Sequence, residues 1–236
     1  MHNLVVSLFL CACAFAHAQS PMQIVMKMNA TYAAAKSYSM HVNMNMYMGT
    51  NDVTPISSGK GIVHKSGEMY FSSIMGKTTI CNKECTVFID EGQKQILYNR
   101  NPKAKNPNHQ KNSEIPDTSE FGRMAKYSFG VGNETSTRIV VIPAEQLIYK
   151  KIELLINKTT FALEELVYYY SDNKSFTSPL SIVRITYSSI QLNNSIPLTQ
   201  FSEKNYVVRK AGTLTGTGNY ASYEVIEQKN EWPIKN

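Results

Sequence analysis

The chain has 236 residues and a formal net charge of +6, with 24 Lys and Arg against 18 Asp and Glu. This length is enough to bury a real hydrophobic core. The basic residues are spread along the chain and form no dense patch or stripe, which argues against a nucleic-acid-binding protein. An anionic lipid headgroup or an acidic partner protein fits this charge better.

The first 18 residues predict an export signal. An almost purely apolar run from Leu4 to Phe15 leads into Ala16-His17-Ala18, the small-x-small pattern that signal peptidase cleaves. The run is shorter than the roughly 20 residues that span a bilayer. We therefore expect cleavage after Ala18, a periplasmic location and no transmembrane segment in the mature chain. The alternative is acylation at Cys13, which would give an outer-membrane lipoprotein.

Residues 19–228 are expected to form a single domain, followed by a polar tail at 229–236. The domain opens with a helix that Ser20 can cap, that has Pro21 at its first position and that extends to about Lys36.

After the helix the hydrophobic period changes from 3.6 to 2. From Met40 to Met48 apolar residues alternate with polar ones, which indicates a half-buried strand. Turn residues then separate many further strands, and such neighbouring hairpins predict one antiparallel sheet, while the longer, later strands suit a barrel or half-barrel. The expected strands lie at about 57–65, 68–75, 78–82, 85–90, 95–99, 136–142, 147–157, 160–171, 181–193 and 220–227.

Residues 100–119 are polar and basic and contain three prolines, so they predict a long loop that is either mobile or functional. A short helix from about Thr118 to Tyr127 is expected after it.

No catalytic motif is present. The His residues that remain after cleavage, at positions 41, 64 and 109, lie in no metalloprotease pattern, and neither a nucleophile elbow nor a phosphate-binding loop occurs. We therefore expect no enzyme activity, no cofactor and no metal.

Cys81 and Cys85 are the cysteines left in the mature chain. In an oxidising compartment such a pair predicts a disulfide. Three residues between two strand ends can bring the cysteines to the Cα separation of about 5.5 Å that a disulfide needs. The alternative is a copper or redox site.

Methionines dominate the apolar face of the strand that ends at Met48, and Met69, Phe71 and Met75 occupy alternate positions of a neighbouring strand. Because Met is unbranched and polarisable, it suits an apolar surface that must fit variable shapes. An ordinary Met-rich core and a Met-based copper site are the alternatives. The expected wall of an apolar ligand cavity consists of Met44, Met46, Met48, Met69 and Phe71.

The order of these features resembles the LolA-like periplasmic lipoprotein-carrier superfamily, with its LolA, LolB and RseB-like members, in a form seen in Bacteroidetes. The likeness covers most of residues 20–228 as an order of elements. The segments that carry it are Tyr32-Ala33-Ala34-Ala35-Lys36-Ser37-Tyr38-Ser39, Ser58-Gly59-Lys60-Gly61, Gly67-Glu68-Met69-Tyr70-Phe71, Thr86-Val87-Phe88-Ile89-Asp90-Glu91-Gly92, Ile96-Leu97-Tyr98-Asn99, Ile182-Val183-Arg184-Ile185-Thr186-Tyr187 and Phe201-Ser202-Glu203-Lys204-Asn205-Tyr206-Val207.

The resemblance implies an α+β fold: an unclosed antiparallel β half-barrel with helices lidding the concave face. It implies a non-enzymatic periplasmic carrier or binder of lipid or lipoprotein acyl chains, held in an apolar cavity. The alternative is an envelope structural or sensor module that acts through contacts with a partner protein, and a third hypothesis is a copper-handling protein. The long basic insert at 100–119 departs from the family pattern.

Overall fold

The computed structural model describes residues 19–48, 54–100, 125–143, 149–171 and 180–228. The leader, Cys13, the loop from 101 to 124 and the tail at 229–236 lie outside these ranges. Most of the helix expected at 118–127 lies outside them too, and its last residues begin strand β7 instead.

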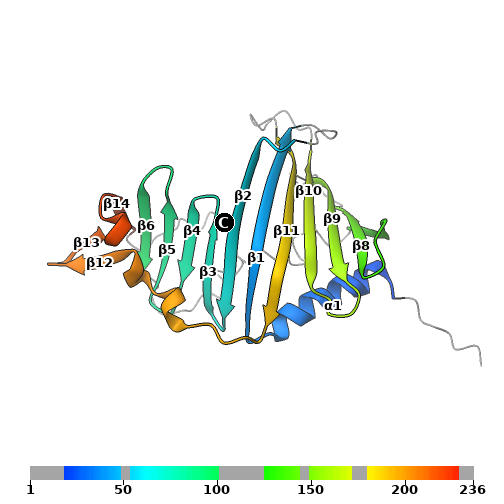
Figure 1. The fold of residues 1–236 in the computed structure, drawn as a ribbon, viewed down its shortest axis with the longest axis horizontal. Coiled ribbons are helices and arrows are strands. Elements are labelled where there is room, and N and C mark those ends of the chain that lie inside the picture. Colours follow the sequence, from blue (N-terminus) through cyan, green and yellow to red (C-terminus); the bar gives the residue numbers. More distant parts are fainter. Residues whose placement is uncertain (1–18, 49–53, 101–124, 144–148, 172–179, 229–236) are drawn as a thin grey trace, which may run out of the picture.

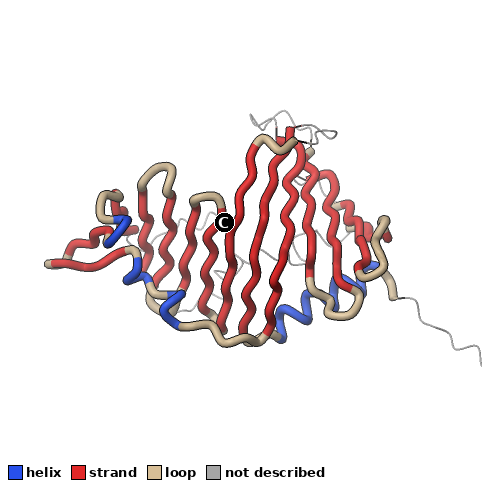
Figure 2. Tube along the Cα trace, in the orientation of Figure 1, coloured by secondary structure: helices blue, strands red, loops and turns tan. Residues whose placement is uncertain are grey.

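The described residues form one α-helix and a 12-stranded sheet whose order is β14-β6-β5-β4-β3-β2-β1-β11-β10-β9-β8-β7, beside a two-stranded β12-β13 sheet (Figures 1 and 2). Neighbouring strands are antiparallel except β14 and β6, which are parallel. The bounds are α1 Pro21–Ala34, β1 Ser37–Met48, β2 Ser57–Ser66, β3 Met69–Ile74, β4 Lys77–Cys81, β5 Cys85–Asp90, β6 Gln95–Arg100, β7 Lys126–Phe129, β8 Ser136–Ile142, β9 Tyr149–Asn157, β10 Leu163–Tyr170, β11 Leu180–Leu192, β12 Val207–Lys210, β13 Thr213–Gly216 and β14 Glu224–Gln228.

The sheet is open. Its centre is the pairing of β1 with β2 on one side and with β11 on the other, so the first strand joins the two halves of the sequence. The described strands leave β14 and β7 as the two edges, and the expected unclosed sheet is therefore confirmed.

Helix α1 begins where the sequence predicts. The Ser20 hydroxyl accepts a hydrogen bond from the Gln23 backbone N–H at 3.3 Å, and the Gln23 side chain accepts one from the Ser20 backbone N–H at 2.9 Å. This capping box satisfies two backbone donors that the first helical turn leaves without partners. At the other end, the buried hydroxyl of Tyr32 accepts a hydrogen bond from the Leu163 N–H at 3.1 Å and fastens the helix to β10. Burial raises the pKa of Tyr32 to about 12, so the phenol stays protonated.

The first hydrophobic core lies on the face of the sheet that α1 covers, here called the helix face. From α1 it includes Val25 and Met28, and from β8 to β11 it includes Ile139, Leu154 and Leu166, all fully buried. On the reverse of these strands, called the opposite face, Arg138 pairs with Glu153 at 3.1 Å and with Glu165 at 2.9 Å. In this half of the sheet the core is therefore on one face and the ion pairs are on the other.

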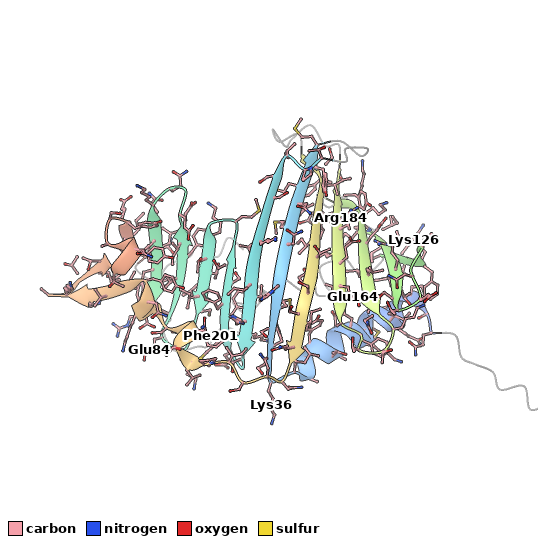
Figure 3. The ribbon with its side chains drawn as sticks, viewed as in Figure 1. Lys36, Glu84, Lys126, Glu164, Arg184 and Phe201 are labelled. Carbon is pink, nitrogen blue, oxygen red and sulfur yellow. The ribbon has the colours of Figure 1, made fainter. Side chains whose placement is uncertain are left out.

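The second core lies on the opposite face of the other half. Phe71, Ile80, Val87 and Ile96 from β3 to β6 pack there against Phe201 and other residues of 196–225, here called the C-terminal segment. Figure 3 labels Phe201 beside the half of the sheet formed by β3 to β6. The Asn82 side-chain amide donates to the Phe201 carbonyl at 3.0 Å and so ties the segment to the β4–β5 turn.

The expectation that several helices lid one face is only partly met. Within the described residues, one α-helix covers the helix face. The opposite face is covered by the C-terminal segment, which contains short 3₁₀ turns and the β12–β13 hairpin. Sequence periodicity did not predict β7, β12 or β13, each of which is only four residues long.

Candidate functional site

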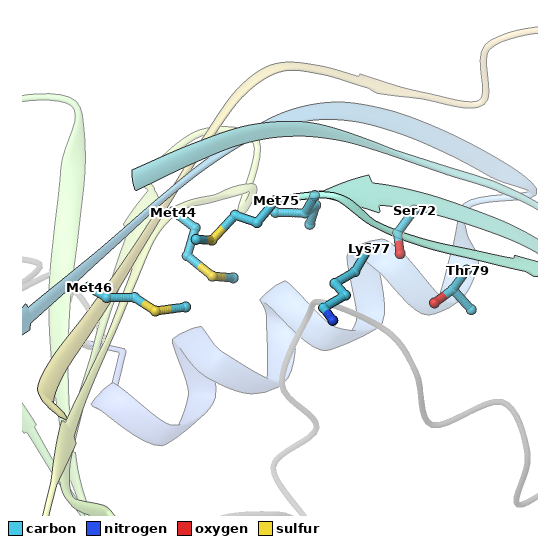
Figure 4. A pocket seen from close by; sticks show the side chains of 7 residues that line it. Met44, Met46, Ser72, Met75, Lys77 and Thr79 are labelled. Carbon is cyan, nitrogen blue, oxygen red and sulfur yellow. The ribbon is translucent and has the colours of Figure 1, made fainter. Parts of the chain in front are cut away.

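An open cavity of about 360 Å³ lies on the helix face, across β1, β3 and β4. In Figure 4 its side chains point toward the side of the sheet on which α1 lies. The lining residues are Met44, Met46, Ser72, Ile74, Met75, Lys77 and Thr79.

Glycines in β2 create the hollow. Gly59 pairs with Met44 of β1, and Gly61 lies between Val42 of β1 and Ile74 of β3. Because neither glycine carries a side chain, this stretch of β2 forms a low floor between two strands that do. A Cβ added at Gly61 would lie 2.2 Å from the Ser73 carbonyl oxygen, so the close approach of the chain requires glycine here.

Met75 fills part of this floor from the β3–β4 turn. Met75 and Gly76 both have positive φ, at 53° and 72°, as in the two-residue turns that match the twist of a hairpin. A Cβ on Gly59 would lie 2.1 Å from the Met75 Cγ, so the thioether side chain lies directly over the glycine. Positive φ is unfavourable for Met and readily adopted by Asn or Gly. The turn therefore keeps a strained residue whose side chain forms cavity wall.

The cavity has an apolar end and a polar end. Met44, Met46 and Met75 gather at one end, and the side chains of Lys77 and Thr79 extend at the other (Figure 4).

At the polar end, Ser72 and Thr79 are direct neighbours across β3 and β4. Lys77, whose side chain is 52% exposed, forms an ion pair with its cross-strand neighbour Asp90. The hydrogen bond from Lys77 lowers the pKa of Asp90, and the Gln93 backbone N–H contributes in the same direction.

The structure brings only part of the hypothesised wall together. Met44 and Met46 line the cavity, whereas Met48 is exposed at the end of β1. Met69 and Phe71 point to the opposite face, where Phe71 is buried in the second core. Their assignment to the same wall as Met44 needs correction, because the register of β3 places its odd-numbered residues on the other side of the sheet.

The remaining wall residues were missed for a related reason. Strict alternation would put Met75 on the same side as Phe71, but the positive φ of the turn directs it to the helix face. Ser72, Ile74, Lys77 and Thr79 occupy the β3 and β4 positions that alternate with residues of the second core, such as Phe71 and Ile80. The signal that could have found Met75 is its place before Gly76 in a two-residue hairpin turn.

The structure does not form the predicted disulfide, and Cys81 and Cys85 are both free thiols in it. Cys81 pairs with Thr86 across the β4–β5 hairpin, so both point to the helix face, and the Thr86 hydroxyl donates to the Cys81 sulfur at 3.6 Å. Cys85 precedes Thr86 in the strand and therefore points to the opposite face, where it is fully buried. Burial raises the pKa of the Cys85 thiol to about 12. Thiols on opposite faces also cannot form the two-cysteine copper site considered above.

Chemistry-bearing residues elsewhere are scattered. His41 and His64 lie on the opposite face, away from the cavity, and His109 lies outside the described residues. Burial, and then the charge of His41, lower the pKa of His64. Among the residues that the structure describes, no three His, Cys, Asp or Glu gather to hold a metal ion. None of the helices in that part of the chain is long and apolar enough to cross a membrane.

The chain is similar in fold to solved proteins of low sequence identity. The crystal structure of an uncharacterised conserved protein from Thermus thermophilus is 10% identical, covers 89% of this chain and 100% of its own, and gives a TM-score of 0.52. A LolA superfamily protein from Nitrosomonas europaea is 13% identical over 79% of this chain and 99% of its own, with a TM-score of 0.35.

LprF from Mycobacterium bovis is 11% identical over 76% of this chain and 97% of its own, with a TM-score of 0.39. No protein-family model and no curated protein sequence matches the chain. The likeness to the Thermus thermophilus protein therefore concerns the fold alone.

Proposed function

We propose that this protein is a non-enzymatic carrier or binder of lipid or lipoprotein acyl chains in the periplasm. The observation that supports it is the hollow on the helix face, where Met44, Met46 and Met75 border a floor of glycine. Its volume of about 360 Å³ falls within the roughly 300–1,000 Å³ typical of small-molecule sites.

The chemistry of the wall suits a flexible apolar chain. Burial contributes about 0.8 kcal/mol for each methylene that leaves water, so an acyl chain needs no covalent bond to be held. Thioether side chains have several rotatable bonds and adapt to chains that differ in length or unsaturation. Export, with cleavage after Ala18, would place the protein between the membranes where such cargo is exchanged.

Native mass spectrometry of protein purified from its own cell envelope tests the proposal. We expect co-bound lipid, and we expect Met44→Asp to abolish it because an unpaired carboxylate in the apolar end is costly to bury. Asn45→Asp is the matched control: it adds the same charge one residue along β1, on the opposite face beside Arg184. The control should retain the lipid.

A protein that stays free of lipid, and whose Met44→Asp variant keeps its cellular function, would contradict the carrier proposal and favour a module acting through protein contacts. The mass of the mature N-terminus separates a soluble form, beginning after Ala18, from a form anchored at an acylated Cys13.

A further inference from the structure

Resting on the proposed function, we infer that the cavity selects acyl chains whose head is an uncharged hydrogen-bond acceptor, such as an ester, over free fatty acids. The ion pair of Lys77 with Asp90 at the polar end of the cavity sets this preference.

The polar end offers hydrogen-bond donors to a ligand. The Lys77 ammonium has three N–H donors and no acceptor, and Asp90 takes one of them. The hydroxyls of Ser72 and Thr79 can donate as well, and both residues line the cavity. An acyl chain that lies along the three methionines thus meets these donors at its head. The head must therefore carry an acceptor, which both an ester carbonyl and a carboxylate provide.

The two acceptors differ in charge, because the carboxylate is negative and the ester is neutral. Asp90 neutralises Lys77, so the polar end has no net positive charge to attract an anion. A ligand carboxylate bound to the same ammonium would lie within a few ångströms of the Asp90 carboxylate and would be repelled by it. Glu91 adds a second negative charge nearby, because its carboxylate lies beside the β3–β4 turn, where a Cβ added at Gly76 would be 3.5 Å from the Glu91 Oε2. An ester accepts the same hydrogen bonds without this repulsion.

The preference can be measured with two ligands of the same chain length, laurate and monolauroylglycerol, at a pH well above the carboxyl pKa. Each is titrated against the fluorescence of bound N-phenyl-1-naphthylamine. We expect the ester to bind about two- to fivefold more tightly than the acid, the scale of a partly exposed charge interaction. Asp90→Asn should bring laurate level with the ester or ahead of it, because Lys77 then keeps an uncompensated charge.

Further variants identify the residues. Lys77→Gln should weaken the ester, because it removes the strongest donor. Lys60→Gln removes the same charge from β2, two strands away from β4, and should change neither affinity because the register of β2 directs Lys60 to the opposite face. Thr79→Val keeps the side-chain shape, removes a donor and should lower ester affinity by about threefold or more.

The outcomes distinguish the two proposals. If neither ligand displaces the probe from the wild-type protein, the carrier function itself fails. If both bind, but equally, and Asp90→Asn leaves their ratio unchanged, the carrier function stands and the selectivity inference is overturned. Tighter binding of laurate by the wild-type protein overturns it as well.

Discussion

In the half of the sheet formed by β8 to β11, buried side chains point toward α1, whereas in the half formed by β3 to β6 the second core points the other way, toward the C-terminal segment. The first half has ion pairs such as Arg138–Glu153 on its opposite face. The second half has Ser72, Lys77 and Thr79 on its helix face. The main cores of the two halves therefore lie on different faces of the sheet.

The cavity lies where the core changes sides. Strands β1 and β2 connect the two halves. On the helix face, these strands and the adjoining β3 and β4 carry the three methionines, two glycines of β2 and the hydroxyls of Ser72 and Thr79. A closely packed interior on both faces would leave no hollow. The change of side supplies a place where apolar residues border space without weakening either core.

The largest expected effect is a loss of stability when a buried residue of either core is truncated. Ile80 and Leu154 are fully buried, one in each core, so Ile80→Ala and Leu154→Ala should each lower the free energy of unfolding by about 2–5 kcal/mol. Thr79→Ala, one residue from Ile80 but facing the cavity, should cost about 1 kcal/mol or less. Urea unfolding followed by circular dichroism measures all three. Equal losses at Thr79 and Ile80 would mean that the cavity face is packed core.

A second variant closes the cavity from its floor. Gly59→Ala places a methyl group where the Met75 Cγ now lies, so Met75 must leave its position. We expect about a tenfold loss of acyl-probe affinity, equivalent to losing one or two methylene-sized contacts. Adding Met75→Ala to Gly59→Ala removes the clash and should restore part of the affinity.

Gly67→Ala is the control for a glycine substitution in the same region. Gly67 has a φ of 58° and no atom within reach of an added Cβ. It should therefore lose stability through backbone strain while probe affinity stays unchanged. A loss of affinity at Gly67 equal to that at Gly59 would show that the Gly59 effect is not local to the cavity.

The sequence predicted the regular parts of this fold because their signals are local. The Ser20–Pro21 helix start and the alternation along β1 come from neighbouring residues, and both are present in the structure. The same alternation predicted that Met44 and Met46 share one face of β1, and both line the cavity. Met69 and Phe71 were placed on the wrong face because alternation within a strand fixes which residues share a face, but not which face meets which cover. That choice depends on the pairing of β1 with β11 and on the C-terminal segment, both distant in sequence.

The cysteines show the same limit at shorter range. The spacing of Cys81 and Cys85 allowed a disulfide, but the register that pairs Cys81 with Thr86 directs the two thiols to opposite faces. The number of residues between two cysteines limits how far apart their Cα atoms can be. The face to which each thiol points depends instead on the register of the strands, which is set by where the turn begins.

The smallest expected effect concerns the strained turn. Met75→Asn should raise the free energy of unfolding by about 0.5–1 kcal/mol, because Asn adopts positive φ with less strain and Asn-Gly is favoured in two-residue hairpin turns. The same change removes the thioether that lies over Gly59, so acyl-probe affinity should fall. Thermal unfolding and probe titration measure the two properties on one sample.

Met75→Ala separates the two causes. It removes the same wall but leaves a residue that has no preference for positive φ, so affinity should fall without the gain in stability. If Met75→Asn becomes more stable and still binds the probe as the wild-type protein does, Met75 is not part of the binding wall. If binding falls as stability rises, the turn keeps an unfavourable residue because the cavity needs its side chain, as strain at functional sites is expected to behave.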